Sequence, residues 1–185
     1  MIDTTFDVNG VLRKRLAASL GLDYYERIMC DARQTNIATD KNFQKAFNAF
    51  YIVRRNETWR NAYYTLFEEL KDKTPTFEYI IRYMYEKTGN IEASFSSKML
   101  ATLNPNKPIW DRYVVENLGL KLDGKNKEEQ LNNAIRLYAD IEKWYEVFLA
   151  TEKAKECIKT FDEALPDYQW INPIKKIDCF LWSIR

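Results

Sequence analysis

The sequence contains no histidine. This absence excludes Ser-His-Asp and Cys-His triads, histidine general bases and histidine-ligated metals. Any chemistry in this chain must therefore come from carboxylates, lysine, tyrosine, serine, threonine or cysteine.

Glycine and proline are scarce, with five of each among 185 residues. A β-rich fold needs many turns, and these two residues supply them, so the composition favours helices. The chain is 46% hydrophobic and 15% aromatic, which is ample for a packed core and excludes general disorder. A chain of this length fits one domain, or two small lobes that share a core.

An excess of positive charge is also missing. Lysine and arginine total 28 against 27 aspartates and glutamates, a net charge of +1. Strong non-specific nucleic-acid binding usually requires a basic excess, so any DNA-binding surface must be a local basic face. Cys30, Cys157 and Cys179 form no CxxC motif, which predicts reduced, mostly buried thiols in a cytoplasmic protein.

Long apolar runs are absent as well. No stretch approaches 18 apolar residues, so no membrane span is expected. The first eight residues lack the basic and apolar regions of a signal peptide. No acidic pair has a metal-ligand spacing, and we predict neither a metal site nor a cofactor.

Apolar residues recur with helical spacing along almost the whole chain, and no alternating strand pattern lasts more than a few residues. Asp40 is suited to cap a helix, and the next helix is expected to begin near Asn56. Thr74 is suited to cap another helix, with Pro75 as its first residue and Gly89 at its end. We therefore predict an all-α fold of about ten helices. The expected ranges are about 11–20, 23–37, 40–55, 56–70, 75–89, 95–103, 111–119, 128–150, 152–165 and 173–185.

The stretch Glu92–Leu120 carries the clearest sign of chemistry. Lys98 follows small residues, and Asp111 stands at an expected helix start. A neutral lysine amine can attack C1′ of a nucleotide and form a Schiff base, while a carboxylate deprotonates the amine or stabilises the developing positive charge. Alternatively, Asp111 only caps its helix and Lys98 is a solvated helix residue. In either case the Asp111 carboxylate should accept a hydrogen bond from the backbone N–H of residue 113 or 114.

The segment Thr88–Ser97 is a candidate hairpin between two helices. In DNA-binding hairpins, small residues let backbone N–H groups approach a phosphate. The hydroxyls of Ser94, Ser96 and Ser97 can donate to the same group. The alternative is an ordinary serine-rich helix start.

Two further features are compatible with a DNA site. Arg54 and Arg55 stand at an expected helix junction and can bind phosphates, or can pair with acidic residues such as Glu57, Glu68 and Glu69. Trp110 can line a base pocket by stacking, or can anchor its turn in the core. The basic runs at 13–15 and 175–176 are more typical of solvated faces.

Residues 98–120 resemble the helix-hairpin-helix DNA glycosylases, the superfamily of endonuclease III-like and oxoguanine glycosylases. Phe95–Lys98 resembles the end of the family's hairpin, and Leu118–Leu120 resembles the end of a later helix. Pro108–Val114 resembles the element that runs from proline through the aspartate to valine, with one residue inserted before the aspartate. Serines stand where the family has hairpin glycines, and Tyr113 stands where it has histidine.

This resemblance implies a glycosylase-like all-α domain, with two lobes and a cleft near residues 95–114. It implies Lys98 and Asp111 as catalytic residues and Trp110 in the base pocket. The DNA-binding residues it implies are Ser94, Ser96, Ser97, Arg54 and Arg55. The leading hypothesis is a DNA-associated protein, a divergent base-excision glycosylase of DNA repair. The alternative is a non-enzymatic helical module that has lost this chemistry and binds a protein partner.

The whole chain also resembles a family of uncharacterised bacterial proteins. Its recurring features correspond to Phe50–Asn56, Ser94–Thr102, Pro108–Asp111 and Lys176–Arg185. This second resemblance covers most of the chain and implies no activity.

The last expected helix should be essential for folding. Ile174, Ile177, Leu181 and Trp182 have the spacing of one apolar face. A chain truncated near residue 170 should therefore unfold or aggregate, which gel filtration and thermal denaturation would detect. A truncated chain that stays monomeric with an unchanged melting transition would contradict this.

Overall fold

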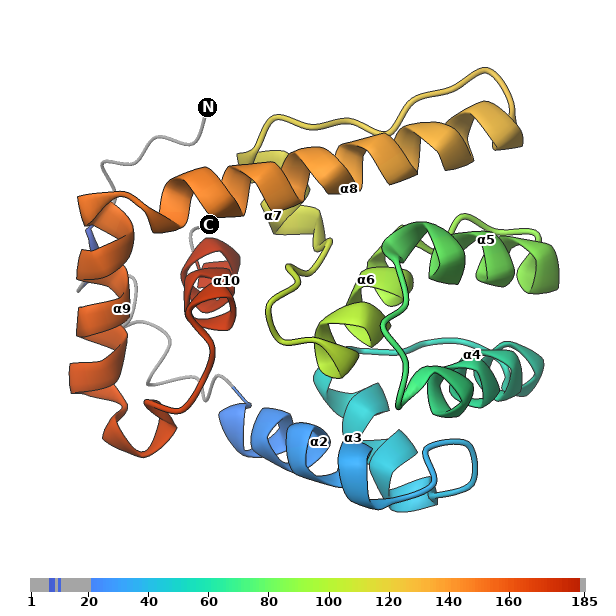
Figure 1. Cartoon of the computed structure of the whole chain (residues 1–185), viewed down its shortest axis with the longest axis horizontal. Helices are drawn as coiled ribbons and strands as arrows, with labels where there is room; N and C mark the ends of the chain where they lie inside the picture. Colours follow the sequence, from blue (N-terminus) through green and yellow to red (C-terminus); the bar gives the residue numbers. More distant parts are fainter. Residues whose placement is uncertain (1–6, 9, 11–20, 184–185) are drawn as a thin grey trace. The chain divides into compact units, whose positions relative to one another are not determined.

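The computed structural model describes residues 7, 8, 10 and 21–183 (Figure 1). The all-α prediction is confirmed, since the described residues form nine α-helices and one short 3-10 helix, with no strand. None of these described helices is both long and apolar enough to span a bilayer. The helix expected at 11–20 lies outside the described residues. The helices are α2 Leu22–Gln34, α3 Lys41–Phe50, α4 Glu57–Leu70, α5 Phe77–Thr88, α6 Ala93–Leu103, α7 Arg112–Asn117, α8 Lys127–Leu149, α9 Glu152–Ala164, η1 Pro166–Tyr168 and α10 Pro173–Ser183.

The chain divides into two compact units between Asn104 and Pro105. The N-terminal unit, Gly21–Asn104, contains α2 to α6. The C-terminal unit contains Pro105–Ser183 with α7 to α10. The boundary falls within the stretch 95–114 that the sequence singled out.

Capping side chains begin α3 and α4 where the sequence predicted. The Asp40 carboxylate accepts hydrogen bonds from the backbone N–H groups of Asn42 and Phe43, at 2.8 and 2.9 Å. The side-chain oxygen of Asn56 accepts from the backbone N–H of Trp59 at 2.9 Å. Each cap satisfies donors that have no partner within the helix, so both helix starts are fixed locally.

The core of the N-terminal unit is mainly aromatic. The α3 rings of Phe43 and Phe47 pack edge-on against the α4 rings of Tyr64 and Phe67, with centroids 5.6–6.5 Å apart. Edge-to-face pairs of this kind add to the free energy gained from burial. This packing joins the two helices, and α6 contacts both α2 and α5 of the same unit.

Several helix boundaries differ from the prediction, and α5 and α2 show the physical reason. Helix α5 begins at Phe77, because Thr76 and not Thr74 caps it, accepting from the backbone N–H of Tyr79 at 3.1 Å. Helix α2 ends at Gln34 and does not reach Ile37. The Ile37 backbone N–H donates to the Glu68 carboxylate on α4 at 2.7 Å, a tertiary bond that replaces a helical one.

Helix α10 is central to the C-terminal unit, because it contacts α7, α8 and α9. Its residues from Lys176 to Leu181 are all buried. The predicted burial is confirmed for Ile177 and Leu181, whereas Ile174 and Trp182 are only half-buried. Residues 184 and 185 lie outside the described part of the chain.

Charged groups on α10 are paired inside the C-terminal unit. Lys176 is 3% exposed and donates to the Asp162 carboxylate and to the Gln169 carbonyl. Asp178 accepts from the Tyr145 hydroxyl at 2.8 Å and from Lys175 at 3.1 Å. The expectation of a solvated face was therefore wrong for Lys176. Such partners are required because an unpaired buried charge is strongly destabilising.

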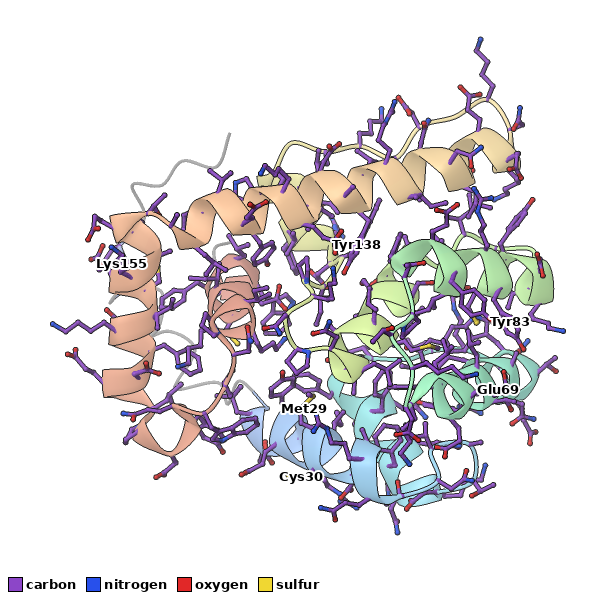
Figure 2. All side chains as sticks on the ribbon, in the orientation of Figure 1. Met29, Cys30, Glu69, Tyr83, Tyr138 and Lys155 are labelled. Carbon is purple, nitrogen blue, oxygen red and sulfur yellow. The ribbon has the colours of Figure 1, made fainter. Side chains whose placement is uncertain are left out.

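The thiols fall into two classes. Cys157 and Cys179 are buried, as predicted, but Cys30 is exposed on α2 (Figure 2). Burial raises the pKa of Cys157 and of Cys179 to about 11, from an ordinary 9.0. Burial also raises the pKa of Tyr63 and Tyr145 well above 10.0. All four groups are therefore held in their neutral, protonated forms.

These pKa shifts predict a loss of stability at alkaline pH. The folded chain keeps protons on Cys157 and Cys179 up to a pKa of about 11, whereas the unfolded chain releases them near 9.0. The free energy of unfolding should be level below about pH 8 and fall as the pH rises from about 9 towards 11. Urea denaturation across this range measures the slope. Unchanged stability up to about pH 11 would contradict the prediction.

Candidate functional site

The hairpin serines lie inside helix α6, not in the connection that precedes it. Gly89, at φ 68°, ends α5 as predicted, and α6 begins at Ala93, before the expected Phe95. Ser96 and Ser97 are fully buried, and Ser97 donates to the Ser94 carbonyl at 2.9 Å. Burial removes both hydroxyls from solvent in this conformation, which counts against contact with a phosphate; the DNA-binding role of these serines stays a prediction.

Lys98 is removed from solvent. Its side chain lies on α6 and is only 8% exposed. The amine nitrogen lies 5.0 Å from the ring centroid of Phe95 and 5.5 Å from that of Tyr51, the residue that follows α3. The alternative of a solvated lysine was therefore wrong, and the desolvation that a lysine nucleophile requires is present.

A buried carboxylate belongs to the same group of side chains. Glu92, 3% exposed, stands at the N-cap of α6 but does not cap it. Instead its carboxylate accepts from the Trp59 indole N–H at 3.0 Å and from the Arg55 guanidinium at 2.8 Å. Sequence reasoning missed Glu92, because nothing in its local pattern separates it from a surface glutamate.

Arg55 forms the partly exposed side of this group. Its side chain is 43% exposed, and its guanidinium carbon lies 5.3 Å from the Phe95 ring centroid and 5.8 Å from that of Trp59. The expectation that Arg55 pairs with Glu57, Glu68 or Glu69 was wrong, because Arg55 pairs with Glu92. Arg54 is exposed and forms no ion pair with any other described residue.

We call these six side chains the Lys98 cluster; they are Tyr51, Arg55, Trp59, Glu92, Phe95 and Lys98. Tyr63 supports the cluster from α4. Its ring stacks on Trp59 at 4.7 Å, and its hydroxyl donates to the Phe95 carbonyl at 2.8 Å. Burial, and then the neighbouring Tyr64, Tyr51 and Glu92, raise the pKa of Tyr63, so its hydroxyl remains a donor. The cluster combines an amine, a carboxylate and a guanidinium among packed aromatic rings.

Asp111 lies in the C-terminal unit. Its carboxylate caps α7 and accepts from the backbone N–H of Tyr113 at 3.0 Å, which confirms the predicted cap. Trp110 and Ile109 beside it are buried, which favours the turn-anchoring interpretation of Trp110. Because Lys98 and Asp111 belong to different units, their joint role stays a prediction.

Within the described residues, no three acidic or cysteine side chains converge in a group that could hold a metal ion. Comparisons of the chain with protein-family models, with curated proteins and with solved structures find no match. The residues of the Lys98 cluster therefore have to support any functional argument themselves.

The Glu92 carboxylate should stabilise the N-terminal unit. Glu92→Ala leaves the buried Trp59 indole N–H without its acceptor, at a cost of about 1–3 kcal/mol. Glu92→Gln keeps an acceptor oxygen and should lose less. Urea denaturation measures both values. The matched control is Glu78→Gln, which removes an exposed ion pair with Arg82 and should change stability by less than about 1 kcal/mol. Equal losses for Glu92→Ala and the control would contradict the inference.

Proposed function

We propose that this chain is a DNA-associated protein with the chemistry of a lysine-type glycosylase, in which Lys98 is the nucleophile. The observation that carries the proposal is the environment of Lys98, 8% exposed with its amine over the rings of Phe95 and Tyr51. Most lysines are solvated because burying an ammonium is unfavourable. A buried lysine beside other ionisable groups is therefore a candidate for function.

The proposed reaction begins with the neutral Lys98 amine. Its nitrogen attacks C1′ of the target nucleotide, and the bond from C1′ to the base nitrogen breaks. The base leaves with that bonding pair and takes up the proton that the amine gives up. The sugar ring then opens: the bond from C1′ to O4′ breaks, O4′ takes up the second proton of the amine, and a Schiff base remains between Lys98 and C1′. Asp111 is the carboxylate that the glycosylase resemblance assigns to this step, and its participation is part of the proposal.

In this proposal, two arginines in the segment that joins α3 to α4 bind the DNA. Arg54 and Arg55 are both exposed, and Arg55 belongs to the Lys98 cluster. Guanidinium groups bind phosphate oxygens with two donors at once. A local basic site of this kind is compatible with a net charge of only +1.

The alternative is a non-enzymatic module that binds a protein partner. Three observations favour it. The net charge is close to zero, Ser96 and Ser97 are buried, and the Arg55 guanidinium is already engaged by Glu92. In this alternative the Lys98 cluster is a structural support for α6.

Borohydride trapping distinguishes these functions. The wild-type chain, incubated with duplexes that carry abasic sites or damaged bases, should form a covalent adduct when borohydride reduces the Schiff base. Lys98→Met, which keeps much of the side-chain volume, should abolish the adduct while the melting transition persists. The matched control Lys45→Ala removes an exposed lysine on α3 and should trap like wild type.

Two results would overturn the proposal. An adduct that persists in Lys98→Met would assign the nucleophile elsewhere. No adduct with any duplex would exclude the lysine mechanism, and a base-release assay would then test a monofunctional glycosylase that uses Asp111 and water. No adduct, no base release and no DNA binding would leave the protein-binding module.

A further inference from the structure

Ile52 has an unusual backbone conformation. It is the one non-glycine residue in the described chain with a positive φ, at 54°. A β-branched side chain is strongly disfavoured there, because its Cβ crowds the backbone. Strain of this kind persists only where the surrounding structure fixes it, and it is concentrated at functional sites.

Helices α3 and α7 end with the same hydrogen-bond pattern, but α7 has a glycine where α3 has Ile52. After α3 the backbone N–H of Val53 donates to the Asn48 carbonyl at 2.9 Å, with Ile52 between the last turn and the donor. After α7 the backbone N–H of Leu120 donates to the Val115 carbonyl at 2.9 Å, with Gly119 at φ 65° in the equivalent place. This six-residue hydrogen bond is typical of the Schellman motif, in which that position is usually glycine.

Core packing does not explain the isoleucine. Its side chain is 58% exposed, one of the most exposed large apolar side chains among the described residues. Its neighbours Tyr51 and Val53 are buried, and the Asn48 side chain accepts from the Tyr64 hydroxyl at 2.8 Å. These contacts fix the turn on both sides of Ile52. The chain thus keeps a strained residue in this turn and exposes its side chain to solvent.

The surroundings of Ile52 indicate which partner the side chain contacts. Arg54 and Arg55 follow within three residues, both are exposed, and the segment 52–56 contains no acidic residue. Tyr51, directly before Ile52, lies against the Lys98 amine. An exposed apolar side chain that two exposed arginines follow in the same segment is complementary to the apolar face of a base next to phosphates.

We propose that Ile52 packs against a base that a lesion or mismatch has weakened in its stack, while Arg54 and Arg55 bind the flanking phosphates. This inference rests on the proposed DNA association and adds a specificity-determining residue to it. Contact with an unstacked base gains apolar burial, whereas a fully paired duplex first has to be opened at an energetic cost. Ile52 therefore selects duplexes with a weakened base step.

The test measures stability and DNA binding on the same variants. Ile52→Gly should leave the melting temperature unchanged or raise it, because glycine accepts a positive φ. Fluorescence anisotropy should show binding to a mismatched or abasic duplex weakened on the order of tenfold, the factor expected when a large aliphatic side chain loses its buried contact. Binding to a fully paired duplex should change much less.

Two controls separate the apolar contact from charge and from general exposure. Val147→Ala removes an equally exposed side chain, also 58%, on α8 and should bind like wild type. Arg54→Ala should weaken binding to paired and mismatched duplexes by similar factors, because phosphate contacts carry no base information.

Three results would overturn the inference. A clearly lowered melting temperature for Ile52→Gly would make Ile52 a packing residue. Unchanged binding of this variant, while wild type binds and forms the borohydride adduct, would refute the role of Ile52 and leave the proposed function standing. Failure of wild type to bind any of the duplexes would refute both, and would favour a protein partner for this surface.

Discussion

Helices α6 and α10 are buried on nearly every side. The polar groups of these helices must therefore find their hydrogen-bond partners inside the protein. Every residue of α6 from Ser96 to Thr102 is buried, and so is every residue of α10 from Lys176 to Leu181. Charged side chains in these segments have lost water and need hydrogen bonds or ionic partners inside the protein. Lys176 has such partners in Asp162 and the Gln169 carbonyl.

The burial of α6 also explains the arrangement of the Lys98 cluster. Glu92 does not cap α6, as its position would allow, but joins Arg55 to Trp59 across the N-terminal unit. Phe95 then lies near two cationic groups, the Arg55 guanidinium at 5.3 Å and the Lys98 amine at 5.0 Å. A structural support would be simpler with apolar residues at these positions, because buried ion pairs seldom stabilise more than well-packed hydrophobic side chains. This comparison favours a functional interpretation of the cluster.

The strained turn at Ile52 and the Lys98 cluster are close together in the N-terminal unit. The strained turn at Ile52 adjoins Tyr51, whose ring contacts the Lys98 amine. The turn that ends α7 has the same hydrogen-bond pattern, but glycine avoids the strain there. Glycine would form the turn after α3 without strain, so the isoleucine at 52 is explained by a role of its side chain and not by the turn.

The sequence alone determined the features that depend on neighbours a few residues away. The all-α class and the caps Asp40 and Asp111 follow from helical spacing and from hydrogen bonds that span two or three residues. Only the tertiary structure decided which polar residues are buried. Arg55 and Glu92 are 37 residues apart in the chain, and no local pattern relates them. Long-range pairs depend on how whole helices pack. The hypothesis of a lysine nucleophile requires a desolvated Lys98, but the residues next to Lys98 in the sequence could not predict its burial.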